Sequence, residues 1–180
     1  MFSTFLKAVA IIKTPMNITY RHLIIAAVVV AAGAAAFFWF FQGDEARIKK
    51  RLNAFAALAS KEPGEHDLTA ALNAGRIGEM FADTCRVEIP AYNIAATYPG
   101  KEVSPRVMGA RARYSEILLR FHDLDIRFPE KDTARVSFIV YAEGVQVSGE
   151  AVREIFDVVC RLEKIDNNWF FNHIEAVLVQ

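Results

Sequence analysis

Residues 150–179 read EAVREIFDVVCRLEKIDNNWFFNHIEAVLV, and this stretch decides the fold. Both halves are rich in valine, isoleucine and aromatic residues, which favours strands. Between them, Asp166-Asn167-Asn168 has the residue types that make tight turns. The sequence therefore predicts a long antiparallel hairpin with strands at Glu150–Lys164 and Trp169–Val179.

Two shorter alternating patterns precede the hairpin, at Leu124–Phe128 and Val136–Glu143, and each predicts a strand. Ser104-Pro105 is a typical helix start, with serine as the cap and proline in the first turn. The apolar residues that follow predict a helix that continues to Phe121. The chain from Val107 to Gln180 thus reads as one long helix followed by four antiparallel strands.

Two more helices are predicted at the start of this domain. Asp44 is the expected cap of the first helix, whose apolar residues follow at helical spacing: Ile48, Leu52, Phe55 and Ala59. Asp67 caps the second helix. A short strand is expected at Cys85–Ile89, whereas Ala91–Glu102 fits either a strand or a loop. Because helices and strands are segregated along the chain, the predicted class is α+β, with three helices covering one face of the sheet.

A membrane segment is predicted at Leu23–Phe41, which contains no charged residue. Its length corresponds to roughly 28 Å of helix, close to the ~30 Å hydrocarbon core of a bilayer. The aromatic run Phe37–Phe41 and this length argue against a cleaved signal peptide, so we expect an uncleaved anchor. Basic residues lie on both sides of the segment, three before it in residues 1–22 and four after it in residues 47–51, so they do not decide its orientation. The N-terminal side has no acidic residue, whereas Asp44 and Glu45 open the other side, and on this basis we expect a cytoplasmic N-terminus. We therefore expect a single-pass protein of the inner membrane whose soluble domain, residues 44–180, is periplasmic.

Composition and motifs exclude several functional classes. Lysine and arginine number 21, as do aspartate and glutamate, so the net charge gives no indication of nucleic-acid binding. The chain has no phosphate-binding loop, dinucleotide fingerprint or metal-ligand spacing, so no cofactor and no metal are expected. Cys85 and Cys160 are either buried free thiols or, in an oxidising compartment, a disulfide, and the sequence leaves both alternatives open.

The element order from Asp44 to Gln180 resembles the nuclear transport factor two-like superfamily, which includes ketosteroid isomerase, scytalone dehydratase and the SnoaL-like proteins. The ending is the most similar part: a basic residue before a polar turn, then Trp169, and a strand that closes in Ile174-Glu175-Ala176-Val177. The resemblance implies a cone-shaped domain of three helices packed on a curved antiparallel sheet. It implies no particular activity, because the superfamily includes enzymes, binding modules and assembly domains. The catalytic aspartates and histidines of the superfamily have no residue-by-residue match here, which favours a protein that is not an enzyme.

Alternation along the strands predicts which side chains face the helices. The inward sets are mostly apolar and include three polar residues, Glu154, Asn172 and His122, which are the candidates for a ligand pocket. A carboxylate among apolar neighbours is an arrangement that general acid–base catalysis uses. The alternative is that Glu154 lies at the open mouth of the cone and is simply solvated.

The outward face of the predicted sheet has more apolar surface than a solvated face needs. Its apolar residues are Ile139, Tyr141, Ile155, Val159, Trp169, Phe171 and Val177. Such a patch is typical of a protein interface, and we expect self-association or contact with another envelope protein. The alternative is that the chain's own segment from Ala91 to Val103 covers this face.

Two functional hypotheses follow. The first is a membrane-anchored, non-catalytic interaction or assembly domain of the bacterial cell envelope. The second is a membrane-tethered binder of, or enzyme acting on, a small apolar molecule in the cone. The volume of the cavity, and the polar groups that converge in it, distinguish the two hypotheses.

Overall fold

The computed structural model describes residues 29–30 and 43–179, and the domain is built from the second of these ranges. Its elements in chain order are a helix over residues 43–59, α2 (Asp67–Gly78), β1 (Phe81–Ile89), a 3₁₀-helix η1 (Pro90–Tyr92), β2 (Ile94–Pro99), α3 (Gly100–Arg111), β3 (Tyr114–Glu130), β4 (Thr133–Gln146), β5 (Ala151–Ile165) and β6 (Asn168–Leu178). The N-terminal segment and, apart from Val29 and Val30, the predicted membrane segment lie outside the described residues. Among the residues that are described, no helix is both long and apolar enough to cross a bilayer.

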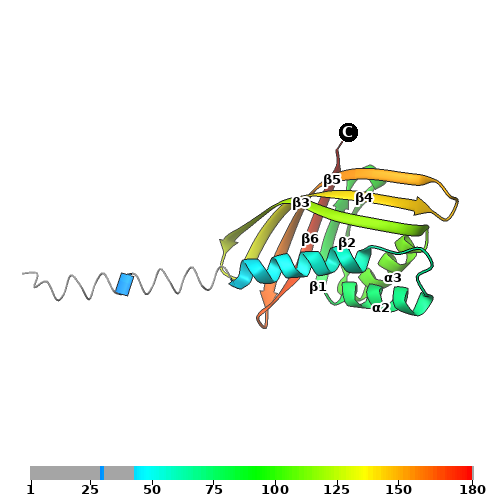
Figure 1. Ribbon diagram of the computed structural model, residues 1–180. Coiled ribbons are helices and arrows are strands. Elements are labelled where there is room, and N and C mark those ends of the chain that lie inside the picture. The colour runs from blue at the N-terminus through cyan, green and yellow to red at the C-terminus, as the bar shows by residue number, and fades with distance from the viewer. Residues whose placement is uncertain (1–28, 31–42, 180) are drawn as a thin grey trace, which may run out of the picture. The chain divides into compact units, whose positions relative to one another are not determined.

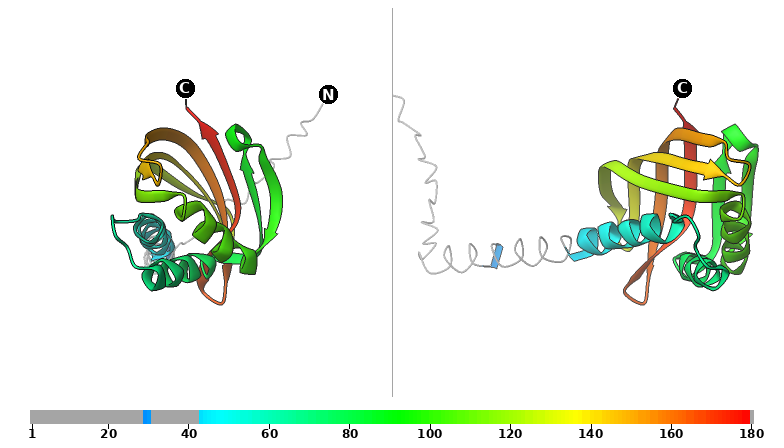
Figure 2. Two further views of the ribbon diagram at one scale, coloured as in Figure 1. Left: turned by 90° about the vertical axis from the view of Figure 1, so that its right-hand side faces the viewer. Right: turned by 45° about the vertical axis from the view of Figure 1, so that its right-hand side comes forward.

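Six strands form one sheet in the order β2-β1-β6-β5-β4-β3. Neighbouring strands are antiparallel except β1 and β6, which run parallel. The long strands curve over the helix at residues 43–59, with α2 and α3 beside it (Figure 1). The turned views show the same curvature, with the helices on the concave side of the sheet (Figure 2). The predicted α+β class, with helices packed on one face of a curved sheet, is confirmed.

The closing hairpin is confirmed, and its strand ends lie within about one residue of the predicted ones, as expected for boundaries read from sequence. Ile165 pairs with Asn168, so the loop contains two residues. These are Asp166 and Asn167, which have φ values of 47° and 66°. Positive φ at both positions makes a type I′ turn, whose twist matches that of the flanking strands.

The predicted long helix is wrong in its second half. α3 begins at Gly100, before the expected Ser104 cap, and ends at Arg111. β3 then begins at Tyr114, and its partly buried Ile117, Leu119 and Phe121 alternate with exposed residues. The core side of β3 therefore follows the two-residue period of a strand, and its pairing with β4 fixes that conformation.

The segment that the sequence left open, Ala91–Glu102, contains the edge strand β2. β2 pairs with β1 from Thr84↔Pro99 to Ile89↔Ile94, and therefore extends the sheet. The predicted strand at Cys85–Ile89 is confirmed and begins four residues earlier, at Phe81. Because β2 lies at the edge of the sheet, the segment does not take the covering role considered above.

The apolar stripe of the first helix is confirmed, since Ile48 and Leu52 are fully buried and Phe55 packs against the core. Asp44 does not act as a cap. Its buried carboxylate accepts hydrogen bonds from Lys164 Nζ at 2.8 Å and from Trp169 Nε1 at 3.2 Å. The first described turn of this helix is thereby bound to the β5–β6 hairpin.

α2 faces the core with a different side from the one its leucines suggest. Leu68 and Leu72 are 72% and 56% exposed, whereas Ala74 and Ile77 are fully buried. α2 contacts α3, and the two helices approach closely at Gly78, where a Cβ atom would lie 3.2 Å from Ser104 Cβ.

Two β-bulges reverse the side-chain alternation that the sequence predicts. On β3 the register shifts between His122 and Asp125, where Asp123 has a φ of 53°. On β6 the register shifts opposite Arg161 and Leu162, so Asn172 is an extra residue. Each bulge inserts one residue, and the side chains before and after it therefore alternate in opposite phase.

Candidate functional site

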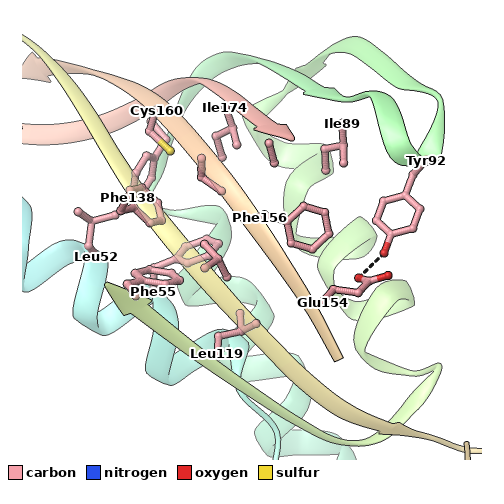
Figure 3. A pocket seen from close by; sticks show the side chains of 15 residues that line it. Leu52, Phe55, Ile89, Tyr92, Leu119, Phe138, Glu154, Phe156, Cys160 and Ile174 are labelled. Atoms are coloured by element: carbon pink, nitrogen blue, oxygen red, sulfur yellow. Dashed lines mark hydrogen bonds between the residues drawn. The ribbon is translucent and has the colours of Figure 1, made fainter. Parts of the chain in front are cut away.

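A largely apolar cavity lies between the concave face of the sheet and the helix over residues 43–59 (Figure 3). Its volume is about 250 Å³. The fifteen residues that line it are Leu52, Phe55, Ile89, Tyr92, Leu119, Phe121, Phe138, Val140, Glu154, Phe156, Val158, Cys160, Phe171, Ile174 and Ala176. A cavity of roughly 150 Å³ can hold benzene, so there is room here for one ring with a short tail.

The polar end of the cavity is formed by Glu154 and Tyr92. The Tyr92 hydroxyl donates a hydrogen bond of 2.5 Å to Glu154 Oε2 (Figure 3). Tyr92 ends the short 3₁₀-helix η1, which has Pro90 at its first position. Asn93 then adopts the left-handed conformation, with φ of 54°, and turns the chain into β2. The turn between β1 and β2 thus places a tyrosine over the end of β5.

The electrostatics of this pair keep Tyr92 as a donor. Partial burial raises the pKa of Tyr92, and its hydrogen bond to the Glu154 carboxylate raises it further. The phenol therefore stays protonated across the physiological range. Glu154 Oε1 accepts no hydrogen bond from the described part of the chain, so this oxygen can bind a donor in the cavity.

Cys160 contributes a thiol to the cavity wall. Burial raises the pKa of Cys160, so the thiol stays neutral. Cys160 and Cys85 are both free and buried. They lie on β5 and β1, with β6 between them, and two strand spacings amount to about 9.5 Å, whereas disulfides need Cα atoms closer than about 7 Å. Of the two alternatives left by the sequence, the structure has the free thiols.

Of the three predicted pocket residues, the structure places only Glu154 at the cavity. His122 is exposed on the convex face, where its ring lies edge-on to Tyr141 at 5.0 Å. Asn172 donates to Glu163 Oε2 at 3.2 Å and does not line the cavity. The inward placement of both residues is wrong, because the bulges at Asp123 and at Asn172 change the phase of alternation.

The predicted interface residues divide into two groups. Five of them lie on the convex face: Ile139, Tyr141, Ile155, Val159 and Val177. Tyr141 and Val177 are the most exposed of these, at 38% and 48%. The outward placement of Trp169 and Phe171 is wrong, since they are 3% and 2% exposed and belong to the core. They precede the β6 bulge, so their phase is opposite to that of Val177.

Tyr92 and the aromatic wall are the parts of the site that sequence reasoning missed. Phe121 and Phe138 have ring centroids 4.8 Å apart, and Tyr92 lies 6.2 Å from Phe156. The turn residues Pro90 and Asn93 were the available indication that Tyr92 leaves the strand. Nothing in the spacing of Tyr92 indicates that it meets Glu154, which is 62 residues away.

The arrangement suits an apolar group with one polar end. A carboxylate oxygen and a hydroxyl converge at one side of a cavity whose other walls are hydrocarbon and aromatic. Within the described ranges, no cluster of three or more His, Cys, Asp or Glu side chains is positioned to hold a metal ion.

No family model matches the chain, and no curated protein matches it. Solved structures do. Hexachlorocyclohexane dehydrochlorinase LinA type 3 of Novosphingobium barchaimii is 15% identical, with a TM-score of 0.62 over 77% of this chain and 88% of that one. A Novosphingobium aromaticivorans protein assigned to the scytalone dehydratases is 16% identical, with a TM-score of 0.61 over 77% and 86%.

The fold is nuclear transport factor two-like. At these identities the likeness shows the fold alone, and it agrees with the cone of helices and curved sheet expected from the sequence. A Xanthomonas campestris protein assigned as a calcium/calmodulin-dependent protein kinase II association domain is also similar. It is 10% identical, with a TM-score of 0.58 over 73% of this chain and 85% of that one. The same fold therefore occurs in proteins named for catalysis and in proteins named for association.

Proposed function

We propose that this domain binds a small, mostly apolar molecule in the cavity, with Glu154 and Tyr92 in contact with its polar end. The observation that supports this best is the cavity of about 250 Å³ that ends in one hydrogen-bonded carboxylate and hydroxyl. Ligand sites are typically concave and apolar with a few convergent polar groups. Hexachlorocyclohexane, for which the similar dehydrochlorinase is named, is itself a small apolar molecule.

Indole is a suitable first probe, because it is neutral, is small enough for a cavity of about 250 Å³ and has a single N–H donor for Glu154. Titration calorimetry with the full-length protein should detect saturable binding. Leu119→Trp, which fills the cavity from β3, should abolish that binding. Leu118→Trp is the matched control, because Leu118 is the adjacent residue and points away from the cavity. Equal binding by both variants would contradict the proposal.

Self-association through the convex face is a second candidate, supported by the five apolar residues that remain there. Tyr141 and Ile155 are cross-strand neighbours at one end of this patch, and Tyr141 is 38% exposed. Sedimentation velocity of the full-length protein should show a dimer that Tyr141→Lys dissociates. A wild-type protein that sediments as a monomer over the whole accessible concentration range would exclude this candidate.

We also propose that Leu23–Phe41 tethers the domain to the inner membrane, with the domain on the periplasmic side. Support comes from the sequence, which is uncharged over the length of a bilayer core. Carbonate washing of membranes should leave the protein in the pellet. A cysteine placed in the domain should react with an impermeant thiol reagent added to intact spheroplasts, and release into the carbonate supernatant would refute the tether.

A further inference from the structure

The charges around the cavity are asymmetric. Glu154 is the one carboxylate among the fifteen lining residues, and no lysine, arginine or histidine is among them. Its sequence neighbour Arg153 pairs with Glu143 at 3.2 Å instead. Tyr92 gives Glu154 a hydrogen bond and no compensating charge. A negative charge therefore stands at the polar end of an apolar cavity, and none of the described residues that line the cavity carries a positive charge to balance it.

Building on the proposed function, we infer that the cavity selects an apolar amine, whose ammonium group binds Glu154 while its hydrocarbon part fills the cone. A carboxylate ligand would bring a second negative charge to the same place, and like charges there are unfavourable. A neutral alcohol would gain a hydrogen bond but no charge interaction. An ammonium gains both.

The polar end of the cavity offers hydrogen-bond acceptors, which is what an ammonium requires. An ammonium has three N–H donors and no acceptor. Glu154 Oε1 and the Tyr92 hydroxyl oxygen can both accept from it, because the tyrosine hydrogen is already donated to Glu154 Oε2. The rings of Tyr92 and Phe156, with centroids 6.2 Å apart, flank the same end of the cavity. Cations are attracted to such aromatic faces.

Three probes with the same ring and chain length isolate the charge: 3-phenylpropylamine, 3-phenylpropan-1-ol and 3-phenylpropionate. Titration calorimetry of the full-length protein near neutral pH should give a Kd for the amine about tenfold lower than for the alcohol, equivalent to a charge–charge gain of about 1.4 kcal/mol. The carboxylate should bind more weakly than the alcohol.

Glu154→Gln should weaken the amine by about tenfold and leave the alcohol within about twofold, since the amide keeps the shape and removes the charge. Asp157→Asn is the matched control, because it removes the same charge from an exposed position of the same strand. Asp157→Asn should leave the order of the three probes unchanged.

Salt provides a readout that needs no variant. Raising sodium chloride from about 50 mM to about 500 mM should weaken the amine several-fold and leave the alcohol unchanged, because salt screens the charge interaction. An alcohol that binds as tightly as the amine at low salt would overturn the amine selectivity and leave the cavity function standing. Failure of all three probes and of indole to bind would overturn the cavity function itself.

Discussion

Arg111 should be one of the most important single side chains for the stability of this domain. It is 4% exposed at the end of α3. Its Nη2 donates to both carboxylate oxygens of Glu65 at 2.7 Å, and its Nη1 donates to the carbonyls of Leu58 and of Ser60, the latter at 2.8 Å. One guanidinium thus binds the end of the helix over residues 43–59, the segment before α2, and α3.

Replacing Arg111 by methionine removes these hydrogen bonds and keeps most of the side-chain volume. Glu65, with 8% of its side chain exposed, is then left without its cation and retains only the hydrogen bond from Asn73 at 3.1 Å. Breaking a buried ion pair by removing one partner costs about 3–5 kcal/mol. With an m-value of about 2 kcal/mol per molar, the urea midpoint should fall by roughly 2 M.

Urea unfolding followed by tryptophan fluorescence measures this loss, because Trp169 is buried in the native core. Arg106→Met on the same helix is the control, since its ion pair with Glu102 is about half exposed, and it should change stability by no more than about 0.5 kcal/mol. Combining Arg111→Met with Glu65→Gln should recover about 2 kcal/mol, because no unpaired buried charge remains. A midpoint shift below about 0.5 M for Arg111→Met, or a double variant that is simply additive, would refute the reasoning.

Three further predictions concern pH, charge and register. Burial raises the pKa of Cys85 to about 12 from its ordinary 9.0, and raises that of Cys160, so the folded state holds protons that the unfolded state loses. The contribution of the two thiols to stability should therefore be constant below about pH 9, and it should fall by up to about 1.4 kcal/mol per pH unit for each thiol between about pH 9 and 12. Urea midpoints measured against pH in this range test it: Cys85→Ala should reduce the slope, and a flat profile would contradict the prediction. Arg135 faces Arg127 on one strand and Arg161 on the other, and Arg161 in turn faces His173. Arg161→Glu should therefore raise the melting temperature at low salt by the equivalent of about 0.5 kcal/mol. Arg153→Glu is the control and should lower the melting temperature, because it loses the ion pair with Glu143. Deleting Asn172 should prevent folding or cost more than about 3 kcal/mol, because it removes the bulge and forces one part of β6 to reverse its faces. Asn172→Ser keeps the bulge and should cost about 1 kcal/mol. Comparable thermal stability of the two variants would disprove that the bulge sets which side chains of β6 face the core.

The sequence predicts elements whose cause is local. The β5–β6 turn follows from Asp166 and Asn167, which tolerate positive φ, and the stripe of Ile48 and Leu52 follows from helical spacing. The boundary between α3 and β3 is different, because Ile117, Leu118 and Leu119 are consecutive apolar residues that suit either period. Pairing with β4 selects the strand, and a tertiary contact of this kind is not visible in a local pattern.

The candidate site was predicted only where the alternation is uninterrupted. Glu154 lies on β5, on the stretch that pairs with β4 without a register shift, so its phase could be counted correctly. Trp169, Phe170 and Phe171 are apolar on both phases, and the hydropathy of this run therefore cannot show which side faces the core. The buried orientation of Trp169 is fixed by its hydrogen bond to Asp44, which is 125 residues away in the sequence.

The binding of Asp44 also has a mechanical consequence. Lys164 and Trp169 hold its carboxylate from the β5–β6 hairpin, and the side chains of Lys164 and Asp44 are each only 6% exposed. Tension applied to the chain ahead of residue 43 would be transmitted at this point into the hairpin, before it reached the rest of the helix. Leu52 and Phe55, which line the cavity, lie beyond that point and would stay in place. A pull from the N-terminal side should therefore load the hairpin before it disturbs the cavity.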